Sequence, residues 1–342
     1  MKVVSLFSGI GAATLGVHAH FPHAQAALFC EADKYARQVL ALRFPGVPIV
    51  DDVRELNLQP GDADLIEAGF PCQDLSVAGR KAGLDGERSG LYGEVLRLVE
   101  QAQPRLVLLE NVPALLRYRG RLEREFAALG YGLTWCKIAA AHVGAPHRRL
   151  RVMVLAERGG FHRGVVDAGP FPNVKGWQTP RVGGSQVACS AEFRRQNPSL
   201  ACEVMPPERW ATPAASDNIN RGDIMNTPAV RRRIGRKQIS LSNQAGRKLS
   251  PDWVEALQGL PVGWTDLECA APRVVGWPAP MVRGMWGDSP QHEDEPARAV
   301  VGKIKHRAAR LRALGNCNPP QQYARALQLL ERGPAQQLLF AG

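Results

Sequence analysis

The stretch KVVSLFSGIGAATLG, residues 2 to 16, decides the fold class. Its apolar run VVSLF has the length of a strand, and a helical pattern follows from Ala13 to Ala19. Between the two, Ser8, Gly9 and Gly11 predict a tight turn in which the backbone can approach a ligand closely. A Gly-x-Gly turn alone is a weak signal, because an ordinary strand-to-helix connection looks the same.

Strand-like runs and helical patterns continue to alternate after this turn. Apolar runs stand at 26–30, 64–68, 106–110 and 151–156, and helical patterns at 34–43, 91–102 and 120–129. Such alternation predicts an α/β fold, in which a mostly parallel sheet is covered by helices on both faces. Ligands of such sheets bind beyond the carboxyl ends of the strands.

The composition is that of a globular, soluble protein. No window of the 342 residues approaches the roughly 18 consecutive apolar residues of a membrane span, and the N-terminus lacks a signal-peptide layout. The seven cysteines are scattered without a CxxC pair, which favours free thiols over disulfides or a zinc site. We therefore expect an intracellular, cytoplasmic protein with no metal.

Much of the positive charge lies in one part of the chain. The formal net charge is +11, and residues 159–248 hold 14 Lys/Arg against 6 Asp/Glu. A concentrated positive field is typical of a nucleic-acid-binding segment, although a merely solvated basic surface would also account for it. Residues 159–246 are rich in Gly, Pro, Asn and Arg and lack a helical or strand period, so we expect a second, loop-rich domain there.

The rest of the chain completes the predicted domain plan. Residues 1–158 form the α/β domain and 159–302 the second domain, with a variable part at 159–246 and a bridging segment at 247–266. A helical pattern resumes from about Lys303, and a final helix is predicted from Gln321 to about Arg332 within a C-terminal part, 303–342. The irregular stretch 270–300 has no predicted role.

Acidic residues follow two successive strand runs. Glu31 comes directly after AALFC, 22 residues after Gly9, where a nucleotide-binding fold places a carboxylate for ribose hydroxyls. Asp51 and Asp52 follow the run PIV. Carboxylates suit a nucleoside cofactor without phosphates better than a dinucleotide, because a pyrophosphate prefers positive or neutral surroundings.

Four further chemically capable side chains lie at strand ends: Cys72, Glu110, Arg149 and Arg151. A thiolate can act as a nucleophile, a glutamate as an acid or hydrogen-bond partner, and arginines as donors to a carbonyl. Any one of them alone is more often structural. Together with a nucleoside-type pocket at the same sheet edge, they indicate a covalent catalyst.

The chain resembles the DNA (cytosine-5) methyltransferases of restriction–modification systems and phages. The resemblance spans nearly the whole chain and rests on motifs in the family's order: FSGIG, EADKYA, DDV, GFPCQ, ENV, PHRRLRV, RKLSPDWVEALQGLP and LGN. It implies a Rossmann-like, S-adenosylmethionine-dependent methyltransferase fold and a variable target-recognition domain at 159–246.

The resemblance also implies roles for individual residues. Cys72 would attack C6 of a cytosine, Glu110 would hold or protonate N3, Arg151 would contact O2, and Arg149 is its neighbour in the same motif. The C5 atom would take the methyl group of S-adenosylmethionine, leaving S-adenosylhomocysteine. The positions that would surround this cofactor are Phe7, Ser8, Gly9, Ile10, Gly11, Glu31, Ala32, Asp52, Val53, Pro71, Leu91 and Asn316.

The expected partner is duplex DNA, from which the cytosine must be flipped out because stacking covers C6. The loop 76–91 matches the family's closing loop, and its Arg80, Lys81 and Arg88 could hold phosphates. The protein is expected to be monomeric and nucleoid-associated, with a cognate restriction endonuclease as a further candidate partner. The recognised DNA sequence is not predicted, because Arg231 to Arg233 and Arg236 are as suitable for phosphates as for bases.

Two departures and two alternative functions accompany this interpretation. His147 stands where the family usually has Gln, and Asn318 where it usually has a small apolar residue. His142 and His147 have no third ligand nearby to complete a metal site. A tRNA-methylating relative is the nearest alternative, but this chain lacks that group's CFT tripeptide. A catalytically silent DNA-binding regulator is disfavoured by the presence of Cys72, Glu110 and Arg151 together.

Overall fold

The computed structural model describes residues 1–71, 91–147, 149–169, 248–278, 291–297, 299–300 and 303–332. The chain divides into two compact units, which are described separately. The first unit comprises Met1–Val143, Arg149–Gly169 and Cys317–Gly342, and the second comprises Gly144–Arg148 and Pro170–Asn316.

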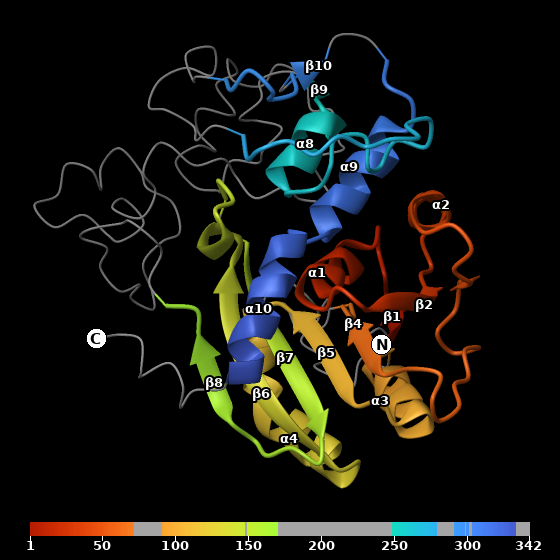
Figure 1. Cartoon of the computed structure of the whole chain (residues 1–342), viewed down its shortest axis with the longest axis vertical. Coiled ribbons are helices and arrows are strands. Elements are labelled where there is room, and N and C mark those ends of the chain that lie inside the picture. The colour runs from red at the N-terminus through yellow and green to blue at the C-terminus, as the bar shows by residue number, and fades with distance from the viewer. Residues whose placement is uncertain are drawn as a thin grey trace, which may run out of the picture. The chain divides into compact units, whose positions relative to one another are not determined.

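An eight-stranded sheet in the order β3-β2-β1-β4-β5-β7-β6-β8 forms the centre of the first unit (Figure 1). The strands are β1 (Lys2–Leu6), β2 (Gln25–Cys30), β3 (Ile49–Val50), β4 (Leu65–Ala68), β5 (Leu106–Asn111), β6 (Tyr131–Ala139), β7 (Leu150–Arg158) and β8 (Gly164–Asp167). All neighbours pair in parallel except β7, which is antiparallel to both β5 and β6. The prediction of a mostly parallel α/β sheet is confirmed.

Helices cover both faces of this sheet. One face packs against α1 (Ala12–His20) and α10 (Pro320–Arg332), and the other against α3 (Leu91–Ala102) and α4 (Arg119–Ala128). Buried apolar side chains form a separate core cluster on each face, with Leu65 in one cluster and Ile66 in the other. Neighbouring residues of a strand point to opposite faces, so a strand buried on both sides contributes to both cores.

The predicted helices match the structure closely. The pattern at 34–43 is helix α2 (Lys34–Arg43), in which the Asp33 carboxylate caps the first turn by accepting from the N–H groups of Tyr35 and Ala36 at 2.9 Å. The predictions at 91–102, 120–129 and 321–332 agree with α3, α4 and α10 to within one residue at each end. Short 3-10 turns, η2 (Pro113–Tyr118) and η3 (Ala140–Val143), follow β5 and β6.

Strand β6 was not predicted from the sequence. Its residues YGLTWCKIA are buried almost throughout, including Thr134 and Cys136. Gly132, Thr134 and Lys137 interrupt its apolar residues, so β6 shows neither the continuous apolar run of the predicted strands nor alternation along its full length. The sheet is therefore extended by two strands beyond β7, with β6 and then β8 at its edge.

Helix α10 packs against α1, although the two helices lie at opposite ends of the chain (Figure 1). Gly16 makes this close packing feasible, because a Cβ atom there would lie only 2.4 Å from the Pro320 carbonyl oxygen and 2.5 Å from Tyr323 Cβ. The C-terminal helix α10 thereby packs on the same face of the sheet as α1.

The second unit is described mainly around α8 (Pro251–Leu257) and α9 (Arg307–Asn316). The short strands β9 (Lys248–Leu249) and β10 (Ala299–Val300) pair in antiparallel fashion. Arg310 of α9 is buried, and its guanidinium lies 2.9 Å from the Glu255 carboxylate of α8, with Asp252 and Asp266 also in ion-pair contact. This buried network fixes the two helices to each other.

Most of the predicted variable part, 159–246, lies outside the described residues from position 170 onward. The predicted closing loop and the arginine group at 231–236 also lie outside them. In the part of the chain that is described, no helix is long and apolar enough to cross a membrane.

Candidate active site

The turn after β1 is shaped by left-handed backbone and by close packing. Phe7, Gly9 and Gly11 have φ angles of 56°, 54° and 80°. At Gly11 a Cβ atom would lie 2.6 Å from the Phe44 ring, whereas at Gly9 it would meet nothing within 4 Å. Gly11 is therefore required by packing, and Gly9 presents its backbone toward open space. Ser8 is held inside the turn by its hydroxyl, which donates to the Ser5 carbonyl at 2.8 Å.

Glu31, at the end of β2, closes this turn from the side. Its carboxylate accepts from the Gly9 N–H at 2.7 Å and from the Asp33 N–H at 2.8 Å. Burial raises the pKa of Glu31, and the two backbone hydrogen bonds oppose that rise. A carboxylate has about four lone-pair sites, so Glu31 can still accept hydrogen bonds from a ligand's hydroxyl groups.

Asp52 follows β3 and lies on the same sheet edge. The Arg54 guanidinium donates to both of its carboxylate oxygens, with Nε 2.9 Å from Oδ1 and 3.1 Å from Oδ2. These hydrogen bonds lower the pKa of Asp52 to about 2. The loop is anchored from α3, because Arg97 donates to the carbonyls of Val53 and Leu56 at 3.0 and 2.9 Å.

Glu110 and Arg151 form an ion pair at the end of β5, with Arg151 Nε 2.9 Å from Glu110 Oε1. The register explains the contact: Glu110 pairs with Met153, and Arg151, two residues earlier on β7, points to the same face. The side chains of both residues are partly buried, 15% exposed for Glu110 and 18% for Arg151.

The segment that leads to Cys72 is fixed beside this pair. The Asn111 side chain donates from Nδ2 to the Phe70 carbonyl at 3.1 Å, and its Oδ1 accepts from the Val112 N–H at 2.8 Å. A Cβ atom at Gly69 would lie 3.4 Å from Glu110 Oε2, so the turn runs past the carboxylate in van der Waals contact. Cys72 itself lies outside the described residues, which stop at Pro71 before resuming at Leu91.

Arg149 is placed differently from Arg151. It is 6% exposed, has a φ angle of +29°, and donates from Nε to Asn318 Oδ1. Burial lowers the pKa of Arg149 to about 10, and the neighbouring positive charge of Arg151 contributes. Arg149 is thus a buried charge supported by Asn318, two residues before α10.

A buried polar contact lies between the sheet and α1, formed by Glu67 and Thr14. Glu67 of β4 is 2% exposed, and one of its carboxylate oxygens accepts from the Thr14 hydroxyl. Burial raises the pKa of Glu67 to about 7, against hydrogen bonds from Thr14 and Ser5. The carboxylate of Glu67 also contributes to raising the pKa of Tyr323, for which burial is the main cause.

The structure brings together many of the predicted site residues at one edge of the sheet. The turn 7–11, Glu31 and Asp52 follow β1, β2 and β3, while Glu110 and Arg151 lie at β5 and β7. Ile10 is fully buried and Val53 nearly so, whereas Ala32 is exposed. Leu91 begins α3, and Asn316 is an exposed residue at the end of α9 in the second unit.

Several residues of the site were missed by the sequence reasoning. Asn111 directly follows Glu110 in the ENV motif, so its proximity was visible although its bond to Phe70 was not. Arg97 gave no signal, because a charged residue on an amphipathic helix is normally solvated. The departure His147 is buried, with Nε2 3.0 Å from the Leu257 carbonyl, and His142 Nδ1 accepts from the Ala139 N–H at 3.0 Å.

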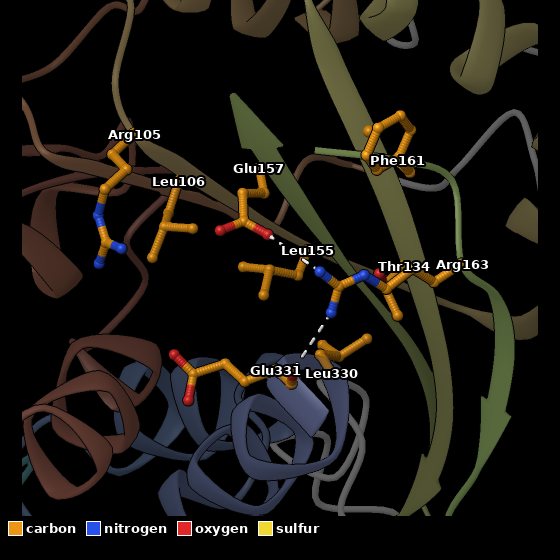
Figure 2. Close-up of a pocket in the computed structure, with 10 residues that line it drawn as sticks. Arg105, Leu106, Thr134, Leu155, Glu157, Phe161, Arg163, Leu330 and Glu331 are labelled. Atoms are coloured by element: carbon orange, nitrogen blue, oxygen red, sulfur yellow. Dashed lines mark hydrogen bonds and ion pairs between the residues drawn. The ribbon is translucent and has the colours of Figure 1, made fainter. Parts of the chain in front are cut away.

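A pocket lies at the opposite end of the β5–β7 strand pair (Figure 2). Its lining mixes two arginines, Arg105 and Arg163, with Glu157 and Glu331. Arg163 points across it, 3.9 Å from the Glu157 carboxylate and donating to the Glu331 carbonyl at 3.4 Å. Its arginine Arg163 is already paired with Glu157, and the pocket lies at the end of β5 and β7 that is far from Glu110. These two features separate it from the candidate active site. Among the described residues, no group of three or more His, Cys, Asp or Glu is arranged to hold a metal ion.

Comparison with solved structures identifies proteins that share this fold. Over 99% of this chain and 100% of the other, the structure is similar to the Dnmt2 methyltransferase of S. pombe, with a TM-score of 0.55 and 14% identity. A putative DNA modification methyltransferase encoded within an E. coli prophage gives a TM-score of 0.50 at 20% identity, over 97% and 99% of the two chains. The fold is therefore that of the methyltransferases.

Sequence comparison identifies the family. The model of the C-5 cytosine-specific DNA methylases matches residues 1–175, and the chain belongs to this family. The type II methyltransferase M2.BsuMI of Bacillus subtilis is 46% identical over 165 residues, covering 46% of this chain and 42% of that protein. M.CviJI of a Paramecium bursaria Chlorella virus is 31% identical over 162 residues, covering 46% and 43%. The chain thus matches less than half the length of each of these curated relatives.

Proposed function

We propose that this protein transfers a methyl group from S-adenosylmethionine to C5 of a cytosine in duplex DNA. The observation that carries the proposal is the Glu110–Arg151 pair at 2.9 Å, beside the Gly69–Pro71 turn that leads to Cys72. An acid, a guanidinium and a thiol are the groups that attack on a cytosine ring requires, and the first two lie beside the segment that leads to the cysteine. Family membership and the type II methyltransferases among the relatives support the same reaction.

The residues at the ends of β1 to β3 suit the proposed cofactor. S-adenosylmethionine would supply the methyl group. Its nucleoside has hydroxyl and amine donors and no phosphate, and Glu31 and Asp52 offer acceptors for such donors. Gly9, with open space where a side chain would stand, allows close approach of the ligand to the backbone. We assign the positions 7–11, Glu31 and Asp52 to this cofactor site.

In the proposed reaction the Cys72 thiolate bonds to C6 of the cytosine, and the ring electrons shift toward N3 and C5. Glu110 holds or protonates N3, which stabilises the charge that develops there. Methylation at C5 is followed by loss of the C5 proton to a base and by cleavage of the C6–sulfur bond, which restores the ring and the thiolate.

Arg151 fits the role of a donor to the base carbonyl O2. A guanidinium has five N–H donors in a fixed fork. The bonds of Arg151 to Glu110 and to the Leu150 carbonyl, the latter at 2.8 Å, leave donors available for O2. Its pairing with Glu110 would keep both groups oriented before the base arrives.

Duplex DNA is the proposed substrate because the basic excess lies in the segment 159–248. We assign target recognition to the domain 159–302, and the cytosine would be flipped out of the duplex to reach Cys72. A monomeric state and a cognate restriction endonuclease remain part of the proposal.

The test is transfer of labelled methyl from S-adenosylmethionine by the purified full chain to duplex DNA and, separately, to tRNA. Label in DNA that maps to cytosine C5 by bisulfite sequencing supports the proposal. Label in tRNA instead would establish the alternative substrate, and binding of DNA without transfer would establish a silent regulator.

Cys72→Ser tests the covalent step. The variant should bind duplex DNA and S-adenosylmethionine as the unsubstituted chain does, yet lose methyl transfer by at least about 10³-fold. A serine variant with near-normal turnover would exclude a sulfur–carbon bond at C6.

A further inference from the structure

The segment that leads into α10 holds the side chain of Arg149. Arg149 Nε donates to Asn318 Oδ1, and Asn318 Nδ2 in turn donates to the Tyr323 hydroxyl at 3.1 Å. All three side chains are buried. The bond to Tyr323 orients the Asn318 amide so that its oxygen faces the guanidinium. Asn318 is also the residue at which this chain departs from the small apolar residue usual in the resemblance.

Helix α10 itself holds the backbone of Arg149. Gln322 Nε2 donates to the Arg149 carbonyl at 3.0 Å and to the Ile138 carbonyl at 2.9 Å. One amide thus connects the beginning of β7 with the end of β6. This restraint acts where the backbone is strained, because Arg149 has a φ angle of +29°, which non-glycine residues rarely adopt. Such a conformation persists only when surrounding contacts enforce it.

Arg149 directly precedes β7 (Leu150–Arg158), and Arg151 is the second residue of that strand, so the position of the first constrains that of the second. Arg151, the second residue of β7, pairs with Ile138 of β6, the residue whose carbonyl Gln322 also binds. The charge of Arg151 contributes to lowering the pKa of Arg149, after burial, which agrees with two guanidinium groups held close together. Close like charges separate unless neighbouring groups hold them.

We propose that Asn318, Gln322 and Tyr323 are positioning residues that hold Arg149 and thereby place Arg151 against Glu110. The inference rests on the proposed methyl transfer, to which it adds residues in the C-terminal helix α10 and just before it. Arg149 itself then acts as a buried support and not as a group that touches the base. A displacement of about 1 Å at a reacting centre can cost about 100-fold in rate, so loss of these contacts should appear in turnover.

The test compares Asn318→Leu, which keeps the shape but removes the acceptor, with Asn318→Asp, which keeps an oxygen facing Arg149. Turnover at saturating DNA and S-adenosylmethionine should fall about 10- to 100-fold in the leucine variant and recover to within about threefold in the aspartate variant. The dissociation constant of S-adenosylmethionine should change less than about threefold in both, because the cofactor residues are not among the contacts removed.

Leu327→Ala is the matched control for loss of stability. Leu327 is a buried α10 residue in the core cluster and takes no part in the hydrogen bonds that hold Arg149. All variants are assayed well below their melting temperatures. If Leu327→Ala lowers turnover as much as Asn318→Leu at an equal loss of melting temperature, the role of Asn318 is only structural and the proposal fails. Tyr323→Phe, which removes one hydroxyl, provides a milder variant should Asn318→Leu not fold, with an expected loss of about 3- to 10-fold.

A second measurement does not depend on activity. Hydrogen exchange of the Arg151 Nε–H, followed by side-chain NMR, should be slow while that group is bonded to Glu110 and about tenfold faster in Asn318→Leu. Faster exchange in a protein that never methylates DNA would refute the proposed function but retain the positioning. Active protein with unchanged Nε–H exchange, or with unchanged turnover, in Asn318→Leu would overturn the positioning.

Discussion

Glu110 and Arg151 face each other across the antiparallel β5–β7 pair, with Oε1 and Nε 2.9 Å apart. The contact follows from strand register, because Arg151 is two residues before the strand partner of Glu110 and therefore points to the same face. Among the described strands of this sheet, only β7 runs antiparallel to both of its neighbours, and its reversed direction brings its beginning to the end of β5. If β5 and β7 ran parallel, the chain would need a crossover connection between these two strands.

Replacement of Glu110 by Gln should abolish most of the proposed activity. The amide keeps the shape and one acceptor but cannot stabilise a positive N3 or donate a carboxylic proton, so turnover should fall about 10²- to 10³-fold. Methyl transfer to a saturating duplex measures this, with binding of S-adenosylmethionine as the control for folding. Retention of more than about a tenth of the turnover would contradict the role given to Glu110.

Arg151→Lys tests the geometry of the fork. Lysine keeps the charge but loses the planar arrangement that lets one side chain bind Glu110 and a base carbonyl together, and we expect turnover to fall about 10- to 100-fold. The surface substitution Arg158→Lys, at the other end of β7, is the matched control and should leave turnover unchanged. If turnover of Arg151→Lys equalled that of the control, a positive charge at position 151 would be sufficient and the planar fork would not be needed.

The sequence predicted the strands that are continuous apolar runs and the helices whose apolar residues recur with a helical period. Helix 34–43 has its Asp33 cap, and the turn 7–11 has its glycines. Sequence patterns cannot reveal which polar side chains meet inside the fold. Arg149 and Asn318 are 169 residues apart, and no local pattern brings them together.

Glu67 illustrates the same limit within one strand. In the run DLIEA a glutamate between apolar residues would normally mark a solvent-facing position. The structure buries it instead, because α1 covers that face and supplies the Thr14 hydroxyl. Burial of a strand on both faces is a property of the packed sheet and is decided by helices distant in the sequence.

Glu67 should make the folded protein less stable as the pH rises. The pKa of Glu67 is about 7 in the folded chain, against the ordinary value of 4.5 that applies to the unfolded chain. The folded chain therefore binds this proton more tightly than the unfolded chain does. The corresponding stabilisation is complete below pH 4.5 and is lost as the pH rises through 7. Relative to Glu67→Gln, which does not titrate, the free energy of unfolding should fall by about 3 kcal/mol across this window.

Urea unfolding of both proteins between pH 4.5 and 8 measures this difference. Thr14→Val provides a second check, because the Thr14 hydroxyl lowers the pKa of Glu67 and its removal should move the decline to higher pH. A difference between the unsubstituted chain and Glu67→Gln that does not change with pH would refute the assignment.

Two helical glycines should respond to alanine in opposite directions. At Gly16 the new methyl group would overlap the Pro320 carbonyl oxygen, so α1 and α10 must separate, at a cost of about 1–3 kcal/mol. At Gly93 of α3 there is nothing within 4 Å, and alanine should raise the free energy of unfolding by about 0.5–1 kcal/mol. Thermal or urea unfolding distinguishes the two; a stabilising Gly16→Ala would disprove the close helix contact.

Glu31→Gln should weaken binding of S-adenosylmethionine while Asp51→Asn should not. The glutamine side chain cannot accept at both oxygen positions, so either the Gly9 N–H or the Asp33 N–H loses its acceptor, and the turn 7–11 loosens. Loss of one hydrogen bond to a charged group corresponds to about 1.5–3 kcal/mol, or about 10- to 100-fold in the dissociation constant. Asp51 is an equally acidic neighbour, but its side chain is 65% exposed and lies 3.7 Å from Arg37, outside this turn. Titration calorimetry with S-adenosylmethionine measures both; an Asp51→Asn variant as weak as Glu31→Gln would indicate that net negative charge, and not the Gly9–Glu31 contact, determines affinity.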